Sequence, residues 1–235
     1  MPVRFSPGQS LLIDADDTLW ENNIYFERAI AAFIKFLDHE SFTVDEIRHR
    51  LDSHEHESIR TLGYGLPSFT RSLVACFEQL RMESITQEAH GNILRFVQSI
   101  REHEITLLPG VAEQLPKLAA RHQLILMTKG VPVEQTDKLI RSGLQRYFTA
   151  VEVVAEKDPA AYRAVVAQHN LDRTQTWMIG NSPRSDVNPA LAAGLHAVLL
   201  FNKDTWTMEH ASVDNPPPGQ HCIELNGFHK LGDYF

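Results

Sequence analysis

Nothing limits the possible folds of this chain more than its short, uninterrupted apolar runs. These runs occupy residues 10–14, 123–128, 151–154, 176–180 and 196–201, and a last short strand is expected at 221–225. Because the apolarity is continuous rather than alternating, each strand is expected to be covered on both faces, as in a parallel sheet with helices on either side. The sequence therefore predicts an α/β fold built on a doubly wound parallel sheet.

The spacing between the first two runs is too long for one crossover. The interval from Asp14 to Thr128 is several times the ~10 to 12 residues that a crossover needs. Residues 23–103 instead look like a series of helices, and the stretch 22–39 repeats apolar residues at intervals of three and four. We therefore expect an α/β core at 1–20 and 105–235, with an inserted α-helical domain at 21–104.

Capping chemistry supports the helical assignment of the insert. Thr43 is followed three residues later by Glu46, the pattern of a capping box at the start of a helix. Gly63, Gly65 and Pro67 then separate this helix from the next one.

Charge and cysteine content narrow the classes of partner. The 235 residues contain 22 Lys+Arg and 30 Asp+Glu, a net charge of −8, which is the wrong sign for gripping nucleic acid or anionic lipid by charge. The apolar runs fall short of the ~20 residues that span a bilayer. The N-terminus lacks an apolar stretch of signal-peptide length, and Cys76 and Cys222 have no second pair beside them. We expect a cytoplasmic protein that binds a small solute, neither nucleic acid nor membrane.

Three carboxylates follow the first strand directly. Asp14, Asp16 and Asp17 lie within four residues at its carboxyl end, where open parallel sheets bind ligands. Carboxylates so close repel one another, and at a half-buried strand end this is tolerable only with a cation or a proton between them. Mg²⁺ suits such a group, although an acidic turn that caps the following helix is an equally good interpretation of this segment alone.

Later strand ends also carry polar groups. The second strand ends in Thr128, Lys129 and Gly130, and Lys157 follows the third strand. After the fourth strand, the segment 180–186 offers Asn181 and Asp186. Each is weak evidence when taken alone, but four successive strand ends present a group suited to phosphate or metal.

Four segments together resemble, in the right order, the four motifs of the haloacid dehalogenase-like (HAD) hydrolase superfamily. They are DADDTL at 14–19, Thr128, the KDP that begins at Lys157, and GNSPRSD at 180–186. The resemblance covers roughly 8–20 and 105–205. It implies a Rossmann-like HAD core, a helical cap of the C1 type, and Mg²⁺-dependent hydrolysis of a phosphomonoester.

The resemblance also implies roles for individual residues. Asp14 would be the nucleophile and Asp16 the general acid and base, while Lys157 would neutralise the transferring group. Thr128 and the backbone after it, at Lys129 and Gly130, would hold the phosphoryl oxygens. The ligands of Mg²⁺ would be the Asp14 carboxylate, the Asp16 carbonyl, Asn181 and Asp186.

Two positions depart from the family's usual pattern. Asp17 stands where Gly is usual, and we expect its side chain to hydrogen-bond its own turn rather than to act as a third acid. Asn181 stands where an acidic metal ligand is usual, so we expect weaker metal binding. Asp186 would then contribute more to holding the metal. Asn181 also resembles the metal-independent dehalogenase branch, but that branch lacks the acid that Asp16 supplies. A 2-haloacid dehalogenase and a non-catalytic phospho-ligand-binding relative remain the alternatives.

The substrate is expected to be a small phosphorylated metabolite such as a nucleotide, a sugar phosphate or a phospho-acid. In the cap, Tyr64 could stack on a base or sugar and Arg71 could pair with a second anionic group, although a plain connector between helices explains this loop as well. His54 and His56 are two residues apart, so on a helix they diverge and do not form a metal site.

Overall fold

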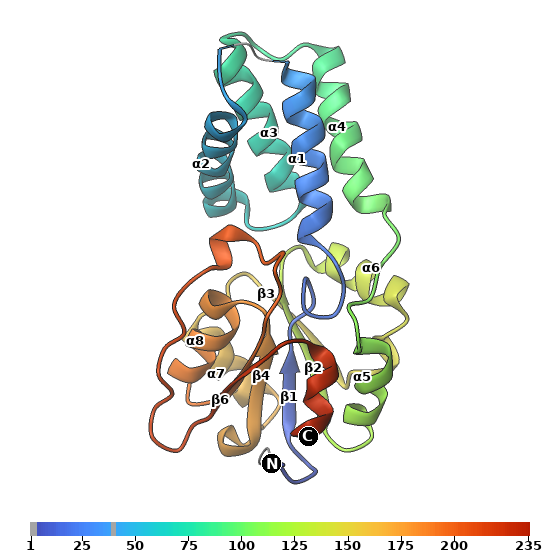
Figure 1. The fold of residues 1–235 in the computed structure, drawn as a ribbon, viewed down its shortest axis with the longest axis vertical. Helices are drawn as coiled ribbons and strands as arrows, with labels where there is room; N and C mark the ends of the chain where they lie inside the picture. Colours follow the sequence, from blue (N-terminus) through green and yellow to red (C-terminus); the bar gives the residue numbers. More distant parts are fainter. Residues whose placement is uncertain (1–3, 39–40) are drawn as a thin grey trace. The chain divides into compact units, whose positions relative to one another are not determined.

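The computed structural model describes residues 4–38 and 41–235, which group into two compact units (Figure 1). One unit comprises residues 1–23 and 105–235, and the other comprises 24–104. Residues 21–23, which the sequence analysis assigns to the helical insert, thus belong to the unit that contains the sheet. Among the described helices, none combines the length and the apolar composition that a membrane crossing requires.

Within the described residues, six strands form one parallel sheet in the order β3-β2-β1-β4-β5-β6. This order confirms the predicted doubly wound α/β fold. The strands are β1 (Ser10–Ile13), β2 (Gln123–Lys129), β3 (Ala150–Val154), β4 (Thr176–Gly180), β5 (His196–Leu200) and β6 (Cys222–Leu225).

Both faces of the sheet are covered, which explains the continuous apolarity of its strands. On β1, Leu11 and Ile13 pack in a cluster with residues of α5 (Val111–Ala119), α6 (Pro132–Ser142) and the C-terminal helical turn Phe228–Asp233. The intervening Leu12 belongs to a second cluster, which includes residues of α7 (Pro159–Gln168) and α8 (Asn188–Ala192). Successive residues of one strand thus face opposite helical layers.

The strand order places β1 at the centre of the carboxyl edge. Its neighbours are β2 on one side and β4 on the other, and the chain arrives at all three ends from the same direction. The segments that follow β1, β2 and β4 therefore meet at one place, as parallel pairing requires.

The helical unit contains α1 (Asn23–Leu37), α2 (Val44–Leu62), α3 (Leu66–Arg81) and α4 (Gln87–Glu102). Its core includes Phe33, Leu51, Leu73 and Ile93, all fully buried. The capping box is confirmed: the Thr43 hydroxyl accepts from the Glu46 backbone N–H, and the Glu46 carboxylate accepts from the Thr43 backbone N–H. His39, the last residue of the expected first helical stretch, lies outside the described residues.

Candidate active site at the carboxyl ends of the strands

Asp14 is the first residue after β1 and is 7% exposed. Its backbone N–H donates to the Ile179 carbonyl of β4 over 2.9 Å, which continues the parallel pairing by one residue and fixes the direction of the carboxylate. The ammonium of Lys157 donates to Asp14 Oδ1, and the Thr18 hydroxyl donates to Oδ2 over 3.0 Å. The strand end therefore presents a buried carboxylate with both oxygens in contact with donors.

Lys157 lies between two buried carboxylates. Its ammonium contacts Asp14 and donates to Asp186 Oδ1 over 2.7 Å, and the residue is only 4% exposed. The other oxygen of Asp186 accepts from the Ser182 backbone N–H over 3.0 Å. A Cβ at Gly180 would lie 2.1 Å from Asp186 Oδ2, so this approach requires glycine at the end of β4. Both oxygens of Asp186 thus have donors within the protein, as those of Asp14 do.

The electrostatics of this trio leave a deficit of positive charge. Burial raises the pKa of the Asp14 carboxyl, Lys157 opposes the rise, and the nearby Asp186 adds to it. Burial lowers the pKa of Lys157, but the two carboxylates outweigh it and raise that pKa above its ordinary value, so the ammonium stays charged. Two carboxylates share one ammonium, and a further cation would relieve the excess negative charge.

Asn181 is joined to Asp14 through one hydroxyl. Thr18 Oγ1 lies 3.0 Å from Asp14 Oδ2 and 3.1 Å from Asn181 Oδ1, so oxygens from the ends of β1 and β4 converge on one point. The Asn181 amide donates to Thr205 Oγ1 over 2.9 Å, and the Thr205 hydroxyl in turn donates to the Asn202 carbonyl over 2.9 Å. The Thr205 hydrogen is thus already used, which favours an amide over a carboxylate at position 181.

Asp14 and Asn181, whose oxygens are bridged by the Thr18 hydroxyl, offer the kinds of ligand that Mg²⁺ prefers. The donors are a carboxylate and an amide oxygen, and the charge deficit lies beside them. Among residues 4–38 and 41–235, no group of three or more His, Cys, Asp or Glu side chains surrounds a common point. Such a site would therefore depend on Asp14, Asn181, backbone oxygens and water rather than on a cage of acidic side chains.

Asp16 turns to a different set of donors. Lys138 Nζ lies 2.6 Å from each of its carboxylate oxygens, Gln135 Nε2 lies 3.0 Å from Oδ2, and Trp20 Nε1 lies 2.8 Å from Oδ1. Burial raises the pKa of Asp16, but the Lys138 ammonium and the other donors outweigh it and bring the pKa below its ordinary value. The Asp16 side chain retains 23% of its exposure, which leaves it accessible from solvent.

Asp17 makes backbone hydrogen bonds within its own segment, as expected. Its φ of 60° is the left-handed conformation in which Gly is favoured. Its carboxylate accepts from the backbone N–H groups of Asn22 and Asn23 at 2.9 and 3.1 Å. Burial raises the pKa of Asp17 to about 7, although these backbone donors oppose the rise. Asp17 thus fastens the segment that leads into α1.

The three acidic residues, which we expected to share a cation or a proton, each face a different set of donors. Asp14 faces Lys157, Asp16 faces Lys138, and Asp17 faces backbone donors. Their side chains diverge because the chain turns after β1, so each carboxylate obtains donors of its own. The unbalanced pair of carboxylates is instead Asp14 and Asp186.

The end of β2 brings Thr128, Lys129 and Gly130 to the same edge. Thr128 is 2% exposed, and Gly130 has a φ of 129°, which turns the chain away from the sheet. Lys129 Nζ donates to Glu209 Oε1 over 2.7 Å and to Ser185 Oγ over 2.9 Å. Glu209 comes from the long connection between β5 and β6.

Glu209 is ionised and held in place. The Ser182 hydroxyl donates to its Oε2 over 2.5 Å. Burial raises the pKa of Glu209, but Lys129 and the hydroxyl donors outweigh it and bring the pKa below its ordinary value. The Glu209 carboxylate therefore forms an ion pair with Lys129, next to the expected position of the phosphoryl group.

Several candidate residues of the sequence analysis lie in the helical unit. Tyr64 lies in the loop before α3, and Arg71 lies on α3, where its guanidinium donates to Thr61 Oγ1 over 3.3 Å. His54 contacts Gln79 Oε1 and His56 contacts the Asp52 carbonyl. The two histidines thus have separate partners.

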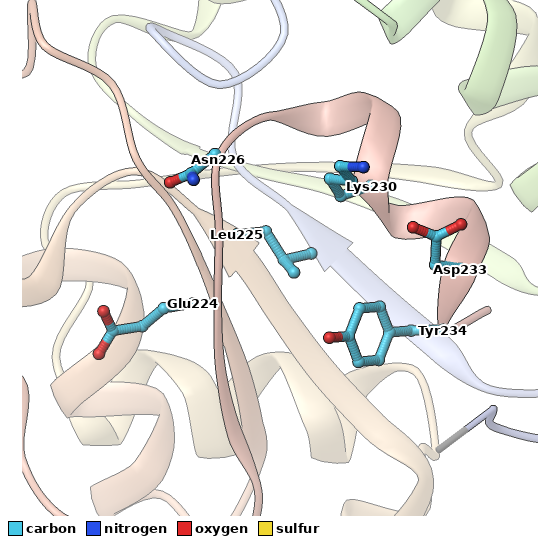
Figure 2. A pocket seen from close by; sticks show the side chains of 6 residues that line it. All are labelled: Glu224, Leu225, Asn226, Lys230, Asp233 and Tyr234. Atoms are coloured by element: carbon cyan, nitrogen blue, oxygen red, sulfur yellow. The ribbon is translucent and has the colours of Figure 1, made fainter. Parts of the chain in front are cut away.

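A hollow lies at the end of β6 and the C-terminal helical turn (Figure 2). It has a volume of about 360 Å³. Its lining comprises Glu224, Leu225, Asn226, Lys230, Asp233 and Tyr234. Its charged side chains are exposed to solvent, and its buried member is the apolar Leu225. The strand ends, with their buried charges, are the stronger candidate.

Several residues of the site carry no signal in the sequence. Lys138 and Gln135 lie within α6, and Glu209 lies in a connection without regular strands or long helices. The spacing of Gln135 and Lys138, three residues apart, places both on one helix face, but the sequence does not indicate that this face meets Asp16. Thr18 is part of the first motif, and its bridging position appears only in the structure.

Comparison with known proteins places these features in a family. The model of the haloacid dehalogenase-like hydrolases matches residues 9–194. A phosphoserine phosphatase of Thermus thermophilus is 32% identical over 82 residues, which are 33% of this chain and 33% of the relative. The chain thus matches about a third of the length of that curated relative.

Solved structures show the same architecture. A haloacid dehalogenase-like family hydrolase of Xanthomonas campestris is 28% identical, with 97% of this chain and 95% of that chain covered and a TM-score of 0.81. A 2-haloacid dehalogenase of Pseudomonas syringae pv. Tomato is 19% identical, with 96% and 97% covered and a TM-score of 0.63. At this lower identity the likeness concerns the fold alone.

Proposed function

Because this chain belongs to the haloacid dehalogenase-like hydrolase family, whose model covers most of it, we propose that it hydrolyses a small phosphomonoester. In this proposal Asp14 is the nucleophile, Asp16 is the general acid and base, and Mg²⁺ is the cofactor. The partial similarity to a phosphoserine phosphatase supports phosphate as the transferred group. Nucleotides, sugar phosphates and phospho-acids are the substrate classes proposed.

The observation that carries the proposal is the second carboxylate at the end of β1. Asp14 is buried against Lys157, while Asp16 is partly exposed at the same strand end and faces a different lysine. Transfer of a phosphoryl group to a carboxylate needs one group to attack and another to protonate the leaving oxygen. Displacement of a halide needs no such proton, because the halide leaves as an anion.

The chain's own residues account for each step. An oxygen of Asp14 attacks phosphorus, the bond from phosphorus to the leaving oxygen breaks, and the protonated form of Asp16 gives its proton to that oxygen. A water molecule then attacks the aspartyl-phosphate while the Asp16 carboxylate takes up its proton, which frees phosphate and restores the Asp14 carboxylate and the protonated Asp16. Thr128 and the backbone N–H groups at Lys129 and Gly130 would hold the phosphoryl oxygens, and Lys157 would offset their charge.

The cofactor follows from the charge balance of the site. A phosphate dianion beside Asp14 and Asp186 meets only one buried ammonium, that of Lys157. At ~4 Å each like-charge pair costs on the order of 4 kcal/mol at an effective dielectric of ~20. When bound at Asp14 and Asn181, Mg²⁺ would supply the missing positive charge and orient the phosphate. Because Asn181 is neutral, we propose that an Asn181→Asp variant reaches half-maximal activity at a lower Mg²⁺ concentration.

A metal-independent 2-haloacid dehalogenase is the second candidate. Asn181, which offers no charge to a metal, favours it, and a protein of that activity shares the fold. Asp16 and its three donors argue against this activity, because a halide leaves without a proton and carbon–halogen cleavage therefore needs no general acid.

Two assays decide between the candidates. Purified protein is incubated with p-nitrophenyl phosphate and Mg²⁺, and separately with 2-chloropropionate in EDTA, and released nitrophenol and chloride are measured. The proposal expects Mg²⁺-dependent release of nitrophenol that Asp14→Asn abolishes. Release of chloride in EDTA, without phosphatase activity, would establish the dehalogenase instead.

A further inference from the structure

Asp16 is held by side chains that lie outside the strand-end motifs. The ammonium of Lys138, on α6, is 2.6 Å from both of its carboxylate oxygens. The side chains of Lys138 and Asp16 are 15% and 23% exposed. The pair is thus more shielded from solvent than the surface ion pairs that contribute little to stability.

Two further donors complete what we call the Asp16 clamp, which consists of Trp20, Gln135 and Lys138. The Trp20 indole donates to Oδ1 over 2.8 Å, and Gln135 donates to Oδ2 over 3.0 Å. Each carboxylate oxygen therefore has one neutral donor and a share of the ammonium. Gln135 also donates to the Lys129 carbonyl over 2.9 Å, which ties the clamp to the end of β2.

The clamp separates the two acids of the site. Lys157 contacts Asp14 and Asp186, whereas Lys138 contacts Asp16 and, over 3.2 Å, Asn22 Oδ1. Lys157 already serves two carboxylates, so the centre around it carries excess negative charge and offers Asp16 no counter-ion. Lys138 supplies Asp16 with a counter-ion of its own and holds its carboxylate in place.

We propose that Lys138 is a positioning residue for Asp16 in the phosphomonoester hydrolysis proposed above, on which this inference rests. Because the ammonium touches both oxygens, it keeps one contact when the other oxygen turns to the leaving group. Trp20 and Gln135 restrict the rotation of the carboxylate about its own axis. Lys138 itself does not touch the reacting atoms and acts through the placement of Asp16.

The test compares leaving groups. Nitrophenolate leaves readily without a proton, whereas the alkoxide of O-phosphoserine must be protonated as it leaves. Lys138→Met removes the ammonium but keeps much of the side-chain length. It is expected to lower kcat for O-phosphoserine by about 100-fold, and for p-nitrophenyl phosphate by less than about 3-fold, with KM nearly unchanged. Lys138→Arg, which keeps the charge, is expected to recover part of the loss.

Arg141→Met provides a matched control, because Arg141 lies on the same helix and pairs with Asp137 instead. It is expected to behave as wild type with both substrates. Gln135→Met serves as a second test should Lys138→Met fold poorly. It removes one donor of the clamp and is expected to produce a smaller loss that is again confined to O-phosphoserine.

The outcomes separate the two proposals. If wild type hydrolyses both esters but Lys138→Met and Gln135→Met lose equal activity on each, or lose none, the positioning role is overturned while the phosphatase proposal stands. If wild type hydrolyses neither ester nor any of a panel of phosphomonoesters, both proposals are overturned. A selective loss that Lys138→Arg partly rescues supports the positioning role.

Discussion

A buried carboxylate in the helical unit, Glu55 on α2, is expected to make the protein less stable as the pH rises through the neutral range. Its Oε2 has no hydrogen-bond partner within the described residues, and the residue is 7% exposed. The nearby Arg48 is engaged elsewhere: its guanidinium donates to Glu27 over 2.6 and 2.7 Å and to Asp52 over 3.0 Å.

These surroundings favour the neutral form of Glu55. Burial raises its pKa from 4.5 to about 7, Arg48 opposes the rise, and Asp52 and Glu27 add to it. Below pH 4.5 the carboxyl is protonated in the folded and unfolded chain alike, and no stability is lost. Between 4.5 and about 7 only the unfolded chain releases the proton, so the free energy of unfolding falls with rising pH. One pKa unit corresponds to ~1.4 kcal/mol, which gives a loss of about 2.5 kcal/mol between pH 5 and pH 8.

The assay is urea unfolding followed by far-ultraviolet circular dichroism at several pH values, in wild type and in Glu55→Gln. The amide is neutral at every pH, so the variant should lack this fall, and its stability relative to wild type should rise by about 2.5 kcal/mol from pH 5 to pH 8. Glu57→Gln on the same helix is the control, because Glu57 is exposed. Parallel pH profiles for wild type and Glu55→Gln would refute the reasoning.

Three further predictions concern the strand ends. Gly180→Ala should lower kcat at least about 100-fold, because its Cβ would lie 2.1 Å from Asp186 Oδ2; wild-type kinetics would contradict this. Glu209→Gln should lower KM for phosphomonoesters several-fold, which corresponds to about 1 kcal/mol, since it removes the nearest carboxylate from Lys129; an unchanged KM at low salt would count against it. Lys157→Met should destabilise the metal-free protein by about 3 to 5 kcal/mol in urea unfolding, because two buried carboxylates lose their counter-ion.

The sheet and the strand-end residues could be predicted because they depend on local patterns. Uninterrupted apolar runs identify strands that are buried on both faces, and parallel strands bring their carboxyl ends to one edge. Asp14 and Asn181 directly follow β1 and β4, Thr128 lies near the end of β2, and Lys157 lies three residues after β3, so strand position brings all four to one edge of the sheet. The Thr43 capping box and the turn role of Asp17 were predictable for the same reason, since both involve neighbours in sequence.

The partners of these residues could not be predicted, because they depend on side-chain direction and on distant segments. Glu209 meets Lys129 across a connection of irregular structure, and nothing in its surroundings distinguishes it from other acidic loop residues. Lys138 lies on a helix whose pattern indicates an amphipathic surface but not what that surface meets. For a similar reason Asp186, expected as a metal ligand, has both oxygens engaged by Lys157 and the Ser182 backbone.

The arrangement of the acidic residues changes the physical argument for a metal. Carboxylates adjacent in sequence suggest a shared cation, but a chain that turns after its strand directs each of them to a different donor. Asp16 is balanced by Lys138, whereas Asp17 meets backbone N–H groups and burial still raises its pKa. The imbalance arises between residues far apart in sequence, Asp14 and Asp186, which share the ammonium of Lys157. Positive charge is therefore missing beside Asp14, where a phosphate dianion would add to the deficit. If a cation serves this site, its affinity should depend on the charge of the Asp14 and Asp186 pair rather than on Asp17.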